Sequence, residues 1–199
     1  EGMSRSEIVS MNREAAKYFY SCLMNPKTPQ GLEYFTKKRG FSLPLIKRFG
    51  MGYAPEGWNG LRDHLKSKGY SYEQMLQANL IQKSREKESY YDVFRNRVMV
   101  PILDVSGNVI AFGGRLLEDG KQPKYLNTSD TSAFRKSKNL FALNFAKDYC
   151  SDRMILCEGY MDVISMHQAG FNQAVASLGT AFTQQQSTIL KRYTDEVLI

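Results

Sequence analysis

Apolar and polar positions in the first third of the chain alternate with the period of amphipathic helices. Apolar side chains between residues 6 and 23 stand three or four positions apart, and the sequence NPKTP ends that pattern. Thr28 can cap a second helix that has Pro29 at its first position. SYEQ, which begins at Ser71, has the form of a capping box. The pattern predicts five helices: residues 6–23, residues 28–40, a short helix after Ser42, residues 59–68, and a helix after Ser71.

From about residue 80 the pattern changes to short segments rich in β-branched and aromatic residues. These segments are NLIQ, YYDVF, RVMVPIL and NVIAFGGRLL, and DVSGN between the last two is typical of a hairpin turn. After Ser137, the sequence NLFALNFAKDYC returns to helical spacing. The middle of the chain is therefore expected to be rich in β-strands.

The last 49 residues predict alternating strands and helices. The expected order is a strand at 154–157, a helix at 160–169, a strand at 174–177, a helix from Thr183 to about Arg192, and a strand in EVLI. By the right-handed crossover rule, strands that are joined through helices in the order β-α-β-α-β form a parallel sheet. We therefore expect an α+β and α/β protein, in which residues 1–150 form a helical and β-rich basic subdomain and residues 151–199 form the parallel unit.

Composition excludes several classes of protein. The chain has 42% hydrophobic and 24% charged residues, which is typical of a globular protein. No apolar run is long enough to cross a bilayer, and the first ten residues do not resemble a signal peptide. Three scattered cysteines and two histidines provide neither a disulfide framework nor a zinc site. We expect a cytoplasmic protein without a membrane partner.

Charge is divided unevenly along the chain. Residues 151–199 hold 3 Lys and Arg against 5 Asp and Glu, so the first 150 residues hold the remaining 24 and 15. A basic larger part beside a slightly acidic end favours a polyanion partner for the first and a metal ion for the second. A solvated basic surface is the alternative explanation.

Two carboxylates mark the turn between the first strand and the first helix of the parallel unit. Glu158 follows the strand, Gly159 permits a turn, and Asp162 lies in the first turn of the helix. Ligands of open α/β sheets collect at this end of the strands, and oxygen donors alone suit Mg²⁺ or Mn²⁺. The alternative is that Asp162 complements the helix dipole and that Glu158 is a solvated loop residue.

Several motifs in the same order resemble bacterial DnaG-type primases. EGYMD followed by AVASLGTAFT resembles the Toprim domain of that family. The resemblance extends upstream through PKYLNTSDTSAFRKSKNLFAL, FRNRVMVPILDVSGNVIAFGGR and KKRGFSLPLIKRFGMGYAPEGW. It implies most of the RNA polymerase domain of a primase, ending in a truncated Toprim unit.

The family resemblance implies an activity and its metal. Such primases join ribonucleoside triphosphates into short RNA primers on a single-stranded DNA template, with divalent cations held in the Toprim domain. Glu158 matches the family's catalytic glutamate and metal ligand, and Asp162 matches the supporting acid. The family's D-x-D cluster would follow Ile199, so we expect this chain to bind DNA weakly and to polymerise nothing.

The resemblance also implies partners and further domains. The family has an amino-terminal zinc-binding domain and a carboxy-terminal domain that binds the replicative helicase, and neither is in this sequence. We expect the chain itself to be a monomer that belongs to the primosome at the replication fork.

Basic and aromatic residues of the middle part are candidates for binding the template and the nucleotides. By resemblance, five residues match positions along that path: Arg39, Arg115, Lys124, Tyr125 and Lys136. Arg95 and Arg97 in FRNR are two residues apart, so we expect their side chains on the same face where a strand begins. The family resemblance supports these two arginines less than the other five residues. A surface ion pair for each arginine and a place in the core for Tyr125 are the alternatives.

Three single aromatic or imidazole side chains are open to more than one interpretation. We expect Trp58 to pack in the core beside Pro55, although it could also be a platform for stacking a base. His64 lies on a charged helix and is expected to be exposed. His167 is expected to be packed or half exposed, because no second metal ligand has a suitable spacing.

Two other functions compete with the primase interpretation. Another Toprim enzyme, a topoisomerase or a nuclease, would share the carboxylates, but no tyrosine-nucleophile domain is recognisable here. A nucleic-acid-binding module that keeps the fold without catalysis is the second alternative. An acidic D-x-D pair after EVLI in the parent sequence would favour polymerase chemistry over such a module.

Overall fold

The computed structural model describes residues 2–199 and divides into two compact units. Unit 1 contains residues up to 101 and residues 109–133, and unit 2 contains residues 102–108 and 134–199. The sequence predicted two domains, residues 1–150 and 151–199. The compact units are a different kind of division, so the domain boundary stays a prediction. Among the described residues, no helix is both long enough and apolar enough to cross a membrane.

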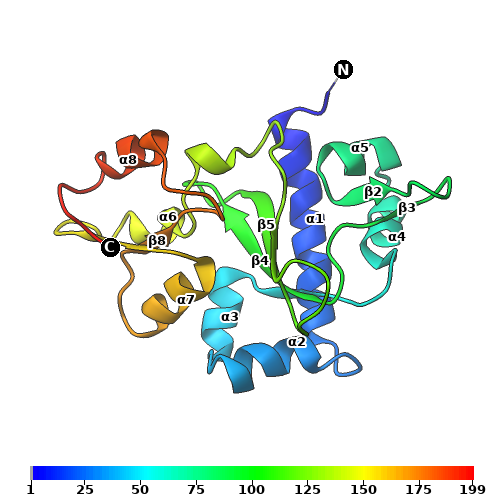
Figure 1. Ribbon diagram of the computed structural model, residues 1–199, viewed down its shortest axis with the longest axis horizontal. Helices are drawn as coiled ribbons and strands as arrows, with labels where there is room; N and C mark the ends of the chain where they lie inside the picture. The colour runs from blue at the N-terminus through cyan, green and yellow to red at the C-terminus, as the bar shows by residue number, and fades with distance from the viewer. Residues whose placement is uncertain (1) are drawn as a thin grey trace. The chain divides into compact units, whose positions relative to one another are not determined.

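Unit 1 combines helices with a four-stranded sheet and a separate hairpin (Figure 1). Its helices are α1 (Arg5–Met24), α2 (Gln30–Glu33), the π-helix η1 (Tyr34–Lys38), α3 (Leu43–Phe49), α4 (Gly60–Ser67) and α5 (Tyr72–Gln77). The sheet has the order β1-β4-β5-β6, formed by β1 (Gly52–Ala54), β4 (Arg97–Leu103), β5 (Val109–Leu116) and β6 (Tyr125–Asn127). The hairpin pairs β2 (Ile81–Lys83) with β3 (Tyr90–Asp92) in antiparallel register.

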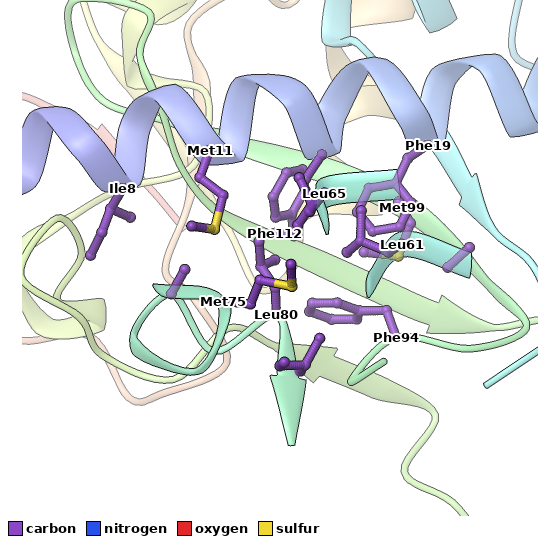
Figure 2. Close-up of a cluster of buried hydrophobic side chains, with 14 of the residues drawn as sticks. Ile8, Met11, Phe19, Leu61, Leu65, Met75, Leu80, Phe94, Met99 and Phe112 are labelled. Atoms are coloured by element: carbon purple, nitrogen blue, oxygen red, sulfur yellow. The ribbon is translucent and has the colours of Figure 1, made fainter. Parts of the chain in front are cut away.

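The long helix α1 runs alongside the sheet, and its apolar face forms the core of unit 1 (Figure 1). Ser4 caps its first turn through a capping box with Glu7. Figure 2 shows the buried cluster, in which the ring of Phe19 lies edge-on to those of Phe94 and Phe112, at centroid distances of 6.5 and 5.3 Å. Burial of each such ring stabilises the fold by about 2 kcal/mol.

One glycine lets α1 approach the sheet closely. A Cβ atom on Gly52 of β1 would stand 2.5 Å from the Cβ of Phe19 and 2.8 Å from its backbone carbonyl carbon. No side chain fits at that separation without moving the helix backbone. The closeness of α1 and β1 therefore depends on the absence of a side chain at this position.

Unit 2 contains the parallel sheet that the sequence predicts. The sheet has the order β8-β7-β9, with β7 (Met154–Cys157) parallel to β8 (Ala174–Ala176) and to β9 (Val197–Leu198). The remaining elements of unit 2 are the 3₁₀-helix η2 (Lys136–Lys138) and the helices α6 (Leu143–Ala146), α7 (Tyr160–Gln168) and α8 (Gln184–Leu190). Phe141 forms a bridge with Ala176, so residues before α6 extend the sheet at its β8 edge.

The fold class is confirmed, while several local predictions are wrong. Capping boxes at Ser71 and Thr183 are present as expected. The sequence patterns did not predict the three-residue strands β1 and β6, because segments this short show no clear alternation. The helical pattern after Ser137 contains only a 3₁₀ turn and the four-residue α6, in part because Phe141 joins the sheet.

Candidate nucleic-acid interface and carboxylate edge

The π-helix η1 brings a tyrosine and an arginine of unit 1 together. The backbone N–H of Arg39 donates to the carbonyl of Tyr34 five residues earlier, at 3.0 Å, and its Nε donates to the Tyr34 hydroxyl at 2.7 Å. The wider turn of a π-helix aligns residues five apart, and such turns often occur at functional sites. Lys38 also faces the Tyr34 ring, with its Nζ 5.8 Å from the ring centroid.

Arg115 lies between two tyrosine rings. Its guanidinium carbon is 4.8 Å from the centroid of the Tyr34 ring and 5.9 Å from that of Tyr125. Arg115 is only 7% exposed, and its Nη1 donates to the Leu116 carbonyl at 2.8 Å. Burial lowers the pKa of Arg39, but the hydroxyls of Tyr34 and Tyr125 raise it more, so its net shift is upward. These two arginines and two tyrosines form one cluster, which we call the arginine–tyrosine cluster.

Lys124 and Tyr125 lie on the outside of unit 1, at the start of β6. Register pairs Tyr125 with Arg115 of β5, and the Lys124 carbonyl accepts from the N–H of Leu116 at 2.8 Å. Tyr125 is 45% exposed, so it is not a core residue, and the Lys124 side chain is exposed. Both side chains are therefore open to a ligand from solvent.

Arg97 is buried and bonded to backbone carbonyls. It is 1% exposed, and its Nη2 donates to Pro123 at 2.7 Å, while its Nη1 donates to Lys124 at 3.2 Å and to Gly114 at 3.3 Å. The expectation that Arg97 and Arg95 share one face is wrong. Asn96 between them has a φ of +50° and β4 begins only at Arg97, so the three residues are not an extended strand.

Arg95 instead lies on an exposed tryptophan. Its guanidinium carbon is 4.2 Å from the ring centroid of Trp58 and 5.2 Å from that of Tyr91. Trp58 is 61% exposed, so the expectation that it packs in the core is wrong. The indole has Tyr91 at its edge, at a centroid distance of 5.7 Å, and Arg95 over its ring. We call Trp58, Tyr91 and Arg95 the tryptophan platform.

A buried aspartate holds the segment that carries this platform. Asp92 of β3 accepts hydrogen bonds from the N–H groups of Leu61 and Arg62, both at 2.9 Å, and so caps α4. Its own N–H donates to the Trp58 carbonyl at 2.7 Å, and its carbonyl accepts from Arg95. Burial raises the pKa of Asp92 to about 6, although the two backbone hydrogen bonds lower it. The aspartate therefore links α4, Trp58 and Arg95.

In unit 2 the two predicted carboxylates lie at the end of β7. Glu158 directly follows the strand, Asp162 is in the first turn of α7, and both are exposed. A Cβ on Gly159 would come within 3.9 Å of the Asp162 Oδ2. Burial and the nearby Asp162 raise the pKa of the Cys157 thiol, which favours its protonated form. Oxygen donors therefore dominate this edge.

The donors at this edge suit part of a site for a hard cation. Within residues 2–199 no three histidine, cysteine, aspartate or glutamate side chains come together as a metal site. Mg²⁺ is commonly held by one or two carboxylates, with water and substrate phosphates completing its coordination. Glu158 and Asp162 fit that chemistry, and they would leave the other positions to water or to phosphate.

The remaining candidates have mainly structural partners. Lys136 lies in η2 and is half-buried, and its backbone carbonyl accepts from Gln186 at 3.0 Å. His64 is half-buried against Tyr18, with ring centroids 5.0 Å apart, so the expectation that it is exposed is wrong. His167 is packed as expected, and its Nε2 contacts the Ala174 carbonyl at 2.8 Å.

Two aromatic members of these groups were not predicted. Tyr34 lies at the centre of the arginine–tyrosine cluster and Tyr91 at the edge of the tryptophan platform. A tyrosine five residues before an arginine is not a helical neighbour, so the sequence gives no signal for the first. Tyr91 alternates with buried Asp92 in β3, and that alternation could have placed it on the outer face.

The fold and the carboxylates first define a class. Residues 155–199, which contain most of the parallel sheet and Glu158, match the family described as "Toprim-like". Residues 18–147 match the family described as "DNA primase catalytic core, N-terminal domain", which covers more than half of the chain. The chain therefore belongs to the DNA primase family and represents part of its catalytic core.

Individual relatives agree with this assignment. The chain is 47% identical to a DNA primase of Clostridium acetobutylicum over 97% of its length and 45% identical to one of Deinococcus radiodurans over 96%. It spans 32% and 33% of those proteins, about a third of each.

Solved structures agree as well. One described as the DnaG primase catalytic domain bound to ssDNA has a TM-score of 0.87 and 37% identity, and the match covers 97% of this chain and 62% of that one. The RNA polymerase domain of Mycobacterium tuberculosis primase DnaG, in complex with a DNA duplex with an overhang, has a TM-score of 0.89, covering 96% and 60%.

The buried carboxylate of Asp92 predicts a pH dependence of stability. Because the pKa of folded Asp92 lies above its ordinary value, the folded protein binds more protons than the unfolded chain between about pH 4 and pH 6. The free energy of unfolding of the protein should therefore fall by roughly 1 to 3 kcal/mol as the pH rises through that window. Urea unfolding at several pH values, for the parent and for Asp92→Asn, measures this effect. An unchanged pH slope in the variant would contradict the assignment.

Proposed function

We propose that this chain forms the template-binding and part of the metal-binding portion of a primase. Unit 1 holds single-stranded DNA through the arginine–tyrosine cluster, Lys124 and the tryptophan platform. Glu158 and Asp162 of unit 2 contribute to a divalent-cation site used in joining ribonucleotides. The observation that carries the proposal is the placement of four exposed or half-exposed groups, Lys124, Tyr125, Trp58 and Arg95, on one unit of a chain in the primase family.

The chemistry of these groups suits a strand that must be held without regard to its sequence. Lysine and arginine neutralise phosphates, and aromatic rings stack on any base. Trp58 offers such a ring at the surface, and Arg95 over it keeps a positive charge beside the stacking face. Arg39 and Arg115 are held by tyrosines rather than by acids, so their charge is not cancelled locally.

Arg97 has a supporting role in this proposal. Its buried guanidinium donates to the backbone carbonyls of Gly114, Pro123 and Lys124. It therefore acts on a ligand by holding the backbone of Lys124, which directly precedes Tyr125, rather than by contact. Lys136 of unit 2 remains a candidate for the nucleotide phosphates.

Glu158 and Asp162 at the end of β7, which we call the carboxylate edge, supply the reaction chemistry in this proposal. A bound Mg²⁺ or Mn²⁺ would neutralise phosphate charge and activate the attacking hydroxyl for nucleotidyl transfer. Glu158 and Asp162 would orient that cation at the end of β7. Ribonucleoside triphosphates are the substrates we propose, with the phosphates as the remaining oxygen donors.

A phosphate contact by Lys124 predicts a specific change in salt dependence. Fluorescence anisotropy of a labelled oligothymidylate, titrated over a range of salt, measures this. Lys124→Ala should reduce the slope of log affinity against log salt by about 1. Lys27→Ala removes an exposed lysine from the turn after α1 and should leave the slope unchanged. Equal slopes for Lys124→Ala and the parent would exclude the contact.

Metal binding at the carboxylate edge predicts selective loss in two variants. Glu158→Gln and Asp162→Asn should each weaken Mn²⁺ binding several-fold, measured by the electron paramagnetic resonance signal of free Mn²⁺. Asp152→Asn changes an exposed acid of the same unit and serves as the control. If all three variants bind Mn²⁺ like the parent, the carboxylates do not hold the ion, and a non-catalytic nucleic-acid-binding module becomes the better account.

A further inference from the structure

Unit 1 has a large open groove. Of the residues assigned to DNA binding above, only Trp58 and Tyr91 line it. It lies between the β2–β3 hairpin and the helices α4 and α5, with a volume of about 1010 Å³. Cations, amides and aromatic rings line it together. The lining residues used below are Trp58, Arg62, Lys83, Arg85, Lys87 and Tyr91.

The charge of the groove is predominantly positive. Four cations line it, namely Arg62, Lys83, Arg85 and Lys87, against a single acid, Glu86. The three hairpin cations are exposed, and no ion pair to them is found among the described residues. Arg62 is fixed in place, because its Nη1 donates to the Tyr90 carbonyl at 2.8 Å and its Nη2 pairs with Asp63 at 2.8 Å. Because Asp63 offsets the charge of Arg62, the cations that the groove offers to an anion are the three exposed ones of the hairpin.

The hairpin places one of its cations opposite an aromatic residue. In the β2–β3 register, Lys83 is opposite Tyr90 and Gln82 is opposite Tyr91, whose hydroxyl donates to the Gln82 side chain at 2.9 Å. Ser84 Oγ accepts from the backbone N–H groups of Glu86 and Lys87, which shapes the turn. Lys83 and Tyr90 therefore share one face of the hairpin, and Gln82 and Tyr91 share the other.

The groove shares two residues with the tryptophan platform. Trp58 and Tyr91 belong to both, and Arg95 lies over the indole ring. A strand that stacks on Trp58 can continue into the groove without leaving a surface of rings and cations. This continuity distinguishes the groove from an isolated basic patch.

We propose that the groove binds a further stretch of the same single-stranded DNA, beyond the base that stacks on Trp58. The proposal rests on the proposed function, and it adds a second segment of the template path with the hairpin cations as phosphate contacts. A groove lined by both cations and aromatic rings suits a chain that carries both phosphates and bases. An acidic peptide would also meet the charge, but it would leave Trp58 and Tyr91 without stacking partners.

The experiment compares the length dependence of binding in two triple variants of the 199-residue chain. The test variant is Lys83→Ala, Arg85→Ala and Lys87→Ala. The control variant, Arg13→Ala, Lys27→Ala and Lys47→Ala, removes three exposed cations that do not line the groove. Affinity is measured for oligothymidylates from about 4 to about 20 nucleotides, a range that brackets typical single-strand sites.

The parent and the control variant should gain affinity as the oligonucleotide lengthens past the shortest that binds. The test variant should lose about tenfold for the long oligonucleotides and less than about twofold for the shortest ones. Its salt slope for long oligonucleotides should fall by about 2, as expected when three phosphate contacts to a single strand are removed. Far-ultraviolet circular dichroism and urea unfolding should match the parent, since all three side chains are exposed.

Other outcomes separate this proposal from the proposed function. If the test variant keeps the parent's gain in affinity with length, the groove proposal is overturned, while the effect of Lys124→Ala still supports template binding by unit 1. If the parent binds no oligonucleotide of any length, both are overturned. If the test variant loses affinity for polyglutamate, used as an acidic polymer, but not for DNA, the groove is a site for acidic protein segments instead.

Discussion

The buried guanidinium of Arg97 is the constraint on which the candidate interface depends. It donates to three backbone carbonyls, at Gly114, Pro123 and Lys124, and joins the start of β4 to β5 and to the segment before β6. Moving any of these carbonyls away would leave a further donor of a buried charge unpaired, so the segments that carry them are held in place. Gly114 gives the side chain its room, because a Cβ there would stand 3.1 Å from the Arg97 Cδ. Arg97 therefore fixes the position of Lys124 and Tyr125 together with the pairing of β5 and β6.

The rest of the interface is assembled on that frame by aromatic rings rather than by acids. Arg115, held in register opposite Tyr125, lies against Tyr34, and the π-helix brings Arg39 to the same ring. Because tyrosine rings and hydroxyls do not neutralise a guanidinium, the positive field of unit 1 is preserved. Trp58 and Arg95 repeat the same chemistry at another point on the unit, where Asp92 caps α4, donates to the Trp58 carbonyl and accepts from the Arg95 guanidinium.

Much of the fold could be predicted because the deciding signals are local. The capping boxes at Ser71 and Thr183 and the order of strands and helices after residue 150 are set by a few neighbouring residues, and the structure confirms them. The placement of Glu158 at the end of β7 and of Asp162 in the first turn of α7 follows from the same local pattern.

What sequence reasoning missed depends on contacts distant in the chain. Trp58 was expected in the core, since an apolar ring normally packs inward, but Arg95 and Tyr91 provide an exposed partner surface that is visible only after folding. Arg97 was grouped with Arg95 by alternation, and the positive φ of Asn96 breaks that alternation. The closeness of Tyr34 to Arg115 joins residues 81 positions apart, and no local pattern contains it.

Hydrogen exchange at the Leu116 amide tests the central role of Arg97 most directly. That amide donates to the Lys124 carbonyl, so its protection reports whether the segment before β6 stays in place. In Arg97→Met, exchange at Leu116 should accelerate at least about tenfold relative to Met51, whose amide donates to Ile46 in another part of unit 1. Arg97→Lys should give an intermediate rate. Unchanged protection of Leu116 in Arg97→Met would contradict the account.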